Sequence, residues 1–139
     1  MFKLHPKLEE DCFHIGDFPL CHLLMMNDRN YPWFILVPRI ADISEIYQLS
    51  STEQAQLTVE SSLLSETLMA MFDGYKMNTA ALGNVVSQLH VHHLVRYEND
   101  PAWPDPVWGK AAAVPHYIDE ADQIKQALRS AFPAELALK

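Results

Sequence analysis

The sequence predicts an α+β fold in which helices pack on one side of an antiparallel sheet. Three observations predict it: short apolar runs bounded by turn residues, one long segment with leucines at helical spacing, and a short polar helix near the C-terminus. The 139 residues contain no internal repeat or low-complexity stretch, and this length suits a single domain covering residues 1–139.

The first strands are expected before residue 38. Residues 12–28 contain two apolar stretches broken by turn residues at 16–19, which predicts two strands joined by a turn. After a polar loop over residues 27–32, the run 33–37 is continuous, apolar and rich in β-formers, and Pro38 closes it. This run therefore predicts a buried strand.

A long helix is expected next. Ser51 and Gln54 have the spacing of a capping box, which satisfies free backbone N–H groups at a helix start. Four apolar residues then recur at spacings of seven, four and three: Leu57, Leu64, Leu68 and Met71. They share one helical face, and Gly74 is expected to stop the helix.

The second half of the chain predicts a hairpin, a loop and a last helix. Residues 75–82 form one expected strand, and residues 85–96 alternate well enough to form another. Residues 97–109 contain three prolines and two tryptophans, which indicates a stiff ordered loop. A final helix is expected to begin near Asp119.

Charge and composition exclude several classes of partner. The net charge is −8, with 18 acidic residues against 10 basic ones and no basic run, so polymeric nucleic acid is disfavoured. A small phosphorylated ligand remains compatible, because backbone N–H groups can hold phosphate. The first ten residues lack the apolar stretch of a secretory signal, and no segment approaches the roughly 20 apolar residues of a membrane span. We expect a cytoplasmic protein without membrane contact, whose only cysteines, Cys12 and Cys21, are reduced.

Three of the seven histidines stand at positions 90, 92 and 93. Side chains alternate along a strand, so Gln88, His90 and His92 are expected to point one way and His93 the other. The Cα atoms of His90 and His92 would lie about 6.5–7 Å apart, close enough for both rings to reach one phosphate.

Paired imidazoles suit phosphoryl chemistry. A neutral imidazole is a nucleophile because one nitrogen keeps a lone pair while the other donates its proton to an orienting acceptor, and a pKa of about 6.5 leaves much of it neutral. The second ring can donate a hydrogen bond to a phosphate oxygen. The Gly83-Asn84 turn just before these histidines can present backbone N–H groups to the same anion.

These residues resemble a known family. The stretch from Asn78 to His92 is similar to the signature region of the histidine triad (HIT) nucleotide-binding proteins, whose motif is His-φ-His-φ-His-φ-φ after a Gly-Gln or similar pair. The Asn27-Asp28 loop followed by Ile35-Leu36-Val37-Pro38-Arg39 resembles the family's ribose-binding strand and its Leu-Val-x-Pro end. The resemblance implies the HIT fold, a homodimer, a purine nucleotide or dinucleotide substrate, and no redox cofactor or metal.

The resemblance also implies roles for individual residues. His90 takes the place of the middle histidine, which attacks the α-phosphate of a diadenosine polyphosphate or nucleoside phosphoramidate, and His92 takes the place of the last, which contacts phosphate. Asn78 and Asn84 match amides on the phosphate side, and either Asn27 or Asp28 matches the ribose contact.

The sequence departs from the pattern at two positions. Gln88 stands where the first histidine is expected, and Val85 stands where many members carry a hydroxyl group. The first position is supportive in this family, so Gln88 can preserve its hydrogen bond, and the substitution is expected to affect turnover more than binding.

Two other functions stay open: a nucleotide-binding protein with little turnover, and a cupin-like metalloprotein using His90, His92 and Glu98. The spacing around these three residues and the long helix argue against the cupin. His93 is expected to be packed, and Trp103 and Trp108 to anchor their loop. Four further histidines have no companion at a useful spacing and are expected to be surface or core residues: His5, His14, His22 and His116.

Overall fold

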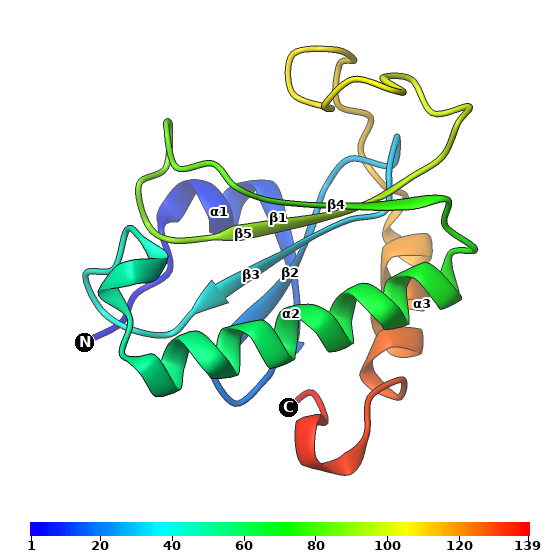
Figure 1. The fold of residues 1–139 in the computed structure, drawn as a ribbon. Coiled ribbons are helices and arrows are strands. Elements are labelled where there is room, and N and C mark those ends of the chain that lie inside the picture. Colours follow the sequence, from blue (N-terminus) through cyan, green and yellow to red (C-terminus); the bar gives the residue numbers. More distant parts are fainter.

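The computed structural model describes residues 1–139, and a five-stranded antiparallel sheet forms its centre (Figure 1). The strand order is β1-β2-β3-β5-β4, and every neighbouring pair is antiparallel. The strands are β1 (Cys12–Asp17), β2 (Cys21–Met26), β3 (Trp33–Pro38), β4 (Lys76–Ala81) and β5 (Val91–Arg96). This architecture confirms the α+β class, the two early strands and the buried strand.

Three α-helices accompany the sheet: α1 (Pro6–Asp11), α2 (Ser51–Met71) and α3 (Ile118–Arg129). Two short 3-10 helices cover Ile46–Gln48 and Ala134–Leu136. The long helix α2 crosses one face of the sheet, whereas α1 lies against the other (Figure 1). The expectation that all helices pack on one side is therefore wrong for α1. That helix has six residues and a single buried one, too few to produce a periodic pattern.

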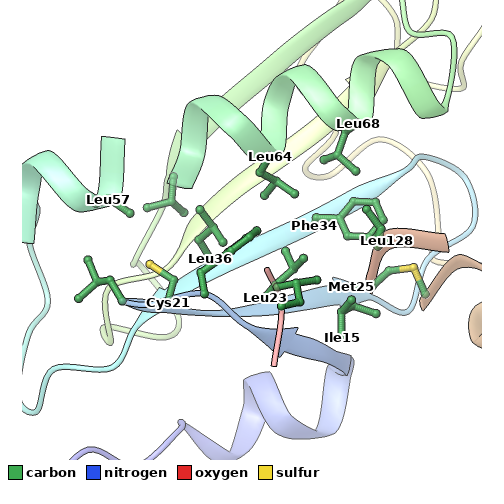
Figure 2. Close-up of a cluster of buried hydrophobic side chains, with 14 of the residues drawn as sticks. Ile15, Cys21, Leu23, Met25, Phe34, Leu36, Leu57, Leu64, Leu68 and Leu128 are labelled. Carbon is green, nitrogen blue, oxygen red and sulfur yellow. The ribbon is translucent and has the colours of Figure 1, made fainter. Parts of the chain in front are cut away.

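Two hydrophobic clusters occupy the two faces of the sheet. All six residues of β3 are buried, and their side chains pack alternately into one cluster and the other. Phe34 and Leu36 pack with Leu64 and Leu68 of α2 and with Leu128 of α3 (Figure 2). The other cluster contains Trp33, Ile35 and Val37 from β3, together with Leu8 of α1 and Leu94 of β5. The second face, where α1 is the only helix, carries the site.

The ends of α2 differ from the expected ones by one to three residues. Ser50, not Ser51, caps the helix: its Oγ accepts from Glu53 N at 3.1 Å, and its own N–H donates to Glu53 Oε1 at 2.8 Å. Both serines have an acceptor side chain three residues later, so the local pattern does not distinguish them. The helix ends at Met71, and Asp73, not Gly74, adopts the left-handed conformation with φ 48°. Gly74 is needed for space, because an added Cβ would lie 2.5 Å from Val95 Cγ1.

The predicted strand over residues 85–96 is wrong in its first half. β5 begins at Val91, and residues 82–90 form an irregular loop that contains Gly83, Asn84 and Gln88. The hydrogen-bonding neighbours explain this limit, because Val91 pairs with Ala81, the last residue of β4, and with Leu36 near the end of β3. Before Val91 no strand continues on the β4 side, and β3 extends only two residues beyond Leu36, to Pro38. Separately, no helix of the chain has the length and apolar character required to cross a membrane.

Candidate active site

His90 and His92 lie side by side on the face of the sheet that carries α1. Their ring centroids are 4.9 Å apart, the rings are nearly perpendicular at 74°, and both residues are buried. His93 points to the opposite face, where its Nε2 lies 2.7 Å from Ser61 Oγ of α2. The alternation expected from the sequence therefore holds, although His90 stands one residue before β5 begins.

A backbone hydrogen bond determines which nitrogen of His90 carries the proton. His90 Nδ1 lies 2.7 Å from the carbonyl oxygen of Gln88. A carbonyl oxygen only accepts, so Nδ1 must donate its N–H. In the neutral ring Nε2 then keeps a free lone pair, as a nucleophile requires.

His92 has the opposite tautomer, which a side-chain hydrogen bond determines. Trp33 Nε1 lies 3.0 Å from His92 Nδ1, and an indole N–H only donates, so Nδ1 accepts and the neutral ring carries its proton on Nε2. Burial, together with the positive charges that His90 and His93 can carry, lowers the pKa of His92 to about 3. His92 is therefore a neutral hydrogen-bond donor at physiological pH.

The sequence analysis missed the role of Trp33 at the site, because a tryptophan in a buried strand is interpreted as a core residue. Its contact with His92 depends on the register of β3 against β5, in which Ile35 faces His92 and Trp33 lies diagonally from it. That register comes from long-range pairing. The sequence contains no local signal for it.

A pocket of about 200 Å³ adjoins both histidines. Its apolar wall consists of six residues from α1, β2 and two loops: Leu8, Met26, Leu82, Val85, Val86 and Trp108. Lys7, Asp11 and Asn84 provide its polar part. The Trp108 ring lies 5.1 Å from His92 and 5.8 Å from Trp33, so Trp108 anchors its loop, as expected, and also lines the pocket.

A second hollow, of about 170 Å³, also adjoins His90 and shares Leu82 and Asn84 with the first. Gly83, Asn84, Gln88 and His90 line it together with the segment at Ser44. The loop over residues 82–90 thus brings Gly83 and Asn84 beside His90, as the sequence analysis expected, although these two residues are exposed and outside any strand.

Both the oxygen and the nitrogen of the Gln88 side-chain amide form hydrogen bonds with the N-terminal segment. Its Oε1 accepts from His5 N at 2.8 Å, and its Nε2 donates to Lys3 O at 2.8 Å. The side chain therefore ties residues 3–5 to the loop that precedes β5, while its backbone carbonyl orients His90.

The structure does not bring Asn27, Asp28 or Asn78 to either hollow. Asn27 Oδ1 accepts from His116 N at 2.8 Å, and the buried Asp28 accepts from Asn30 N at 3.0 Å. These two side chains organise the loop around them. Asn78 Oδ1 accepts from Arg96 Nη1 at 2.8 Å, two pairs along β4 from the pair Ala80–His92. Their contacts with a nucleotide stay predictions.

Comparison with known proteins assigns this fold and site to a family. The HIT domain matches residues 7–99, which include α1 apart from Pro6, the whole sheet and both histidines. The chain belongs to the HIT domain family. This is a family of nucleotide-binding hydrolases and transferases, so the resemblance seen in the sequence is confirmed at the level of the family.

Solved HIT structures are closely similar over almost the whole chain. A histidine triad protein from Marinobacter aquaeolei VT8 is 52% identical with a TM-score of 0.91, covering 93% of this chain and 94% of that one. One from Bradyrhizobium japonicum is 45% identical with a TM-score of 0.91, covering 94% and 97%. One from Sinorhizobium meliloti 1021 is 42% identical with a TM-score of 0.92, covering 95% and 98%. A search of curated proteins finds no match.

The HIT fold also decides against the cupin-like alternative. A five-stranded sheet crossed by a long helix is not a jelly roll. No carboxylate or thiol completes a three-ligand set with His90 and His92, and Glu98 lies exposed in the turn after β5.

Proposed function

We propose that this HIT protein is a nucleotide hydrolase or transferase in which His90 attacks the α-phosphate of a purine nucleotide. The observation that carries the proposal is the hydrogen bond from His90 Nδ1 to the Gln88 carbonyl, which leaves Nε2 unprotonated in the neutral ring. The substrates proposed are a nucleoside phosphoramidate or a diadenosine polyphosphate. The product after hydrolysis is the mononucleotide.

The reaction has two in-line displacements. His90 Nε2 forms a bond to phosphorus as the bond to the leaving group breaks, and the positive charge on the new nucleotidyl-histidine is stabilised by the Gln88 carbonyl at Nδ1. Water then displaces His90 and releases the mononucleotide. In each step His92 donates from Nε2 to a non-bridging phosphate oxygen, where negative charge accumulates.

The two hollows beside His90 suggest how a nucleotide lies. The apolar wall of the 200 Å³ pocket suits a purine base, with Trp108 and Met26 on its faces. The smaller hollow, with Gly83 and Asn84, suits the phosphate and the start of the leaving group. On this assignment Asn27, directly after Met26, is the closer of the two proposed ribose contacts along the chain.

A second candidate function is nucleotide binding with little turnover. In our proposal Gln88 occupies the place of the first triad histidine, and its amide is engaged by Lys3 and His5 instead of a phosphate or another histidine. This arrangement favours binding over catalysis if the reaction needs a third imidazole.

We also propose that the protein is a homodimer formed through β4. The sheet has two edges, and the β1 edge is occupied at Asp17, which exchanges backbone hydrogen bonds with Lys139 at 2.9 and 3.0 Å. The outer side of β4 has no strand beside it. Pairing of two β4 strands would cover this edge.

One assay separates these functions. Wild type and His90→Ala are incubated with adenosine 5′-phosphoramidate and with a diadenosine polyphosphate, and AMP is measured. We expect release by wild type only, and a covalent adduct of AMP mass on wild type in quenched samples. The matched control is His14→Ala, because His14 lies outside both hollows.

Equal AMP release by wild type and His90→Ala would reject His90 as the nucleophile. Binding of AMP by wild type without any release from either substrate would favour the binding function.

A further inference from the structure

Three metal-ligating side chains meet on the hairpin of β1 and β2, outside the hollows beside His90. His14 and Asp17 come from β1, and His22 comes from β2. Their ligating atoms all lie within 4.8 Å of one another. His14 Nε2 lies 2.8 Å from Asp17 Oδ1, and His22 Nδ1 contacts the same oxygen.

A β-bulge creates this cluster. In a regular strand, residues three apart point to opposite faces, so His14 and Asp17 would be separated by the sheet. The register shifts between His14 and Gly16: His14 pairs with Leu24, whereas Gly16 already pairs with Leu23 and Asp17 with His22. The extra residue turns Asp17 to the face of His14, directly opposite His22.

The rest of the fold holds the bulge in place. Arg129 of α3 donates from Nη1 to the carbonyl of Ile15 at 2.9 Å, and Lys139 exchanges backbone hydrogen bonds with Asp17. Gly16 leaves little room for a side chain, because an added Cβ would lie 3.0 Å from both Arg129 Nη1 and Leu138 Cβ. The position of Asp17 between the two imidazoles is therefore imposed by packing on the opposite face, independently of the hydrogen bonds within the cluster.

We propose that His14, Asp17 and His22 form a binding site for a divalent transition-metal ion, with zinc as the expected ion. Two imidazoles and one carboxylate match the ligands that zinc takes in proteins, and the same set binds other divalent first-row metals with open positions. The side chains are 50%, 33% and 20% exposed for His14, Asp17 and His22, so an ion can enter and water can complete its coordination.

The alternative is an ion pair in which one carboxylate holds two histidines. Both descriptions use the same contacts, but they differ in what happens when metal is added. Zinc requires an unprotonated nitrogen on each ring at the atoms that now face Asp17 Oδ1, so binding would replace these two hydrogen bonds with coordination bonds. An ion pair alone has no affinity for zinc beyond that of scattered surface histidines.

Calorimetric titration of the metal-free chain with zinc tests the proposal. We expect one zinc per chain in wild type, and affinity at least tenfold weaker in His14→Ala, His22→Ala and Asp17→Asn. His90→Ala is the matched control, because His90 and His92 are the other adjacent imidazoles, and its zinc affinity is expected to equal that of wild type. Asp17→Asn keeps the side-chain shape, which guards against loss of fold as the cause.

A second measurement uses the wild type alone. Added Co²⁺ should broaden the imidazole NMR signals of His14 and His22 before those of His90 and His92. Absence of zinc binding by wild type, unchanged affinity in all three variants, or loss of binding only in His90→Ala would each overturn the proposal. None of these outcomes bears on nucleotide hydrolysis.

Discussion

Replacing Trp33 with phenylalanine removes the hydrogen bond that determines the tautomer of His92. The indole N–H donates to His92 Nδ1 at 3.0 Å, and both residues are buried, so no bulk water replaces it. A buried acceptor that loses its donor destabilises the arrangement by about 1–3 kcal/mol of free energy. The ring can avoid this cost by moving its proton to Nδ1, which removes the donor at Nε2.

The expected effect on catalysis follows from that penalty. A loss of about 1–2 kcal/mol in the transition state corresponds to a fall of about 5- to 30-fold in kcat/KM, since about 1.4 kcal/mol is tenfold in rate. The assay is AMP release from adenosine 5′-phosphoramidate, combined with ¹⁵N NMR of the imidazoles to read the tautomer. We expect the wild-type His92 to carry its proton on Nε2 and the variant to show a mixture.

Trp108→Phe is the matched control. It alters an indole 5.1 Å from His92 that makes no hydrogen bond to that ring, so KM should rise while the tautomer stays that of the wild type. If Trp33→Phe keeps both the Nε2–H tautomer and the wild-type kcat/KM, Trp33 does not position His92 and the reasoning fails.

Two further predictions concern pH and assembly. Burial lowers the pKa of His92 to about 3 and that of His93 to about 4, so the unfolded state binds more protons than the native state between these values and about 6.5. The free energy of unfolding is therefore highest above about pH 6.5 and falls as the pH decreases. Between pH 7 and pH 5, the free energy of unfolding measured with urea should fall by about 2 kcal/mol for each of these two histidines. A fall confined to pH below 4 would contradict this prediction. Light scattering coupled to gel filtration should give twice the 15.9 kDa mass of the chain, and the monomer mass at micromolar concentration would reject pairing through β4.

The neutral state of His92 explains how a protein of net charge −8 would hold the phosphate of the proposed substrate. A donor that carries no charge needs no counter-ion and does not lose its proton near neutral pH. Trp33 and burial supply this property, and no basic cluster is needed at the site.

The sequence by itself determined the features that depend on local pattern. The apolar runs located β1, β2 and β3, because a run of β-formers between turn residues has few alternatives. The spacing of Leu57, Leu64 and Leu68 located α2, and alternation separated His93 from His92. The HIT motif then pointed to His90, which lies where two hollows meet.

Only the tertiary structure decided the features that depend on partners distant in sequence. β5 starts at Val91, opposite the last residue of β4, and the His92 tautomer depends on a tryptophan 59 positions away. The histidines at 14 and 22 appeared to lack companions because Asp17 reaches them through a bulge that α3 and the C-terminus hold from the opposite face. Strand register and bulges are set by packing between segments that are distant in the sequence. Such packing produces no periodic pattern in the local sequence of the residues that meet.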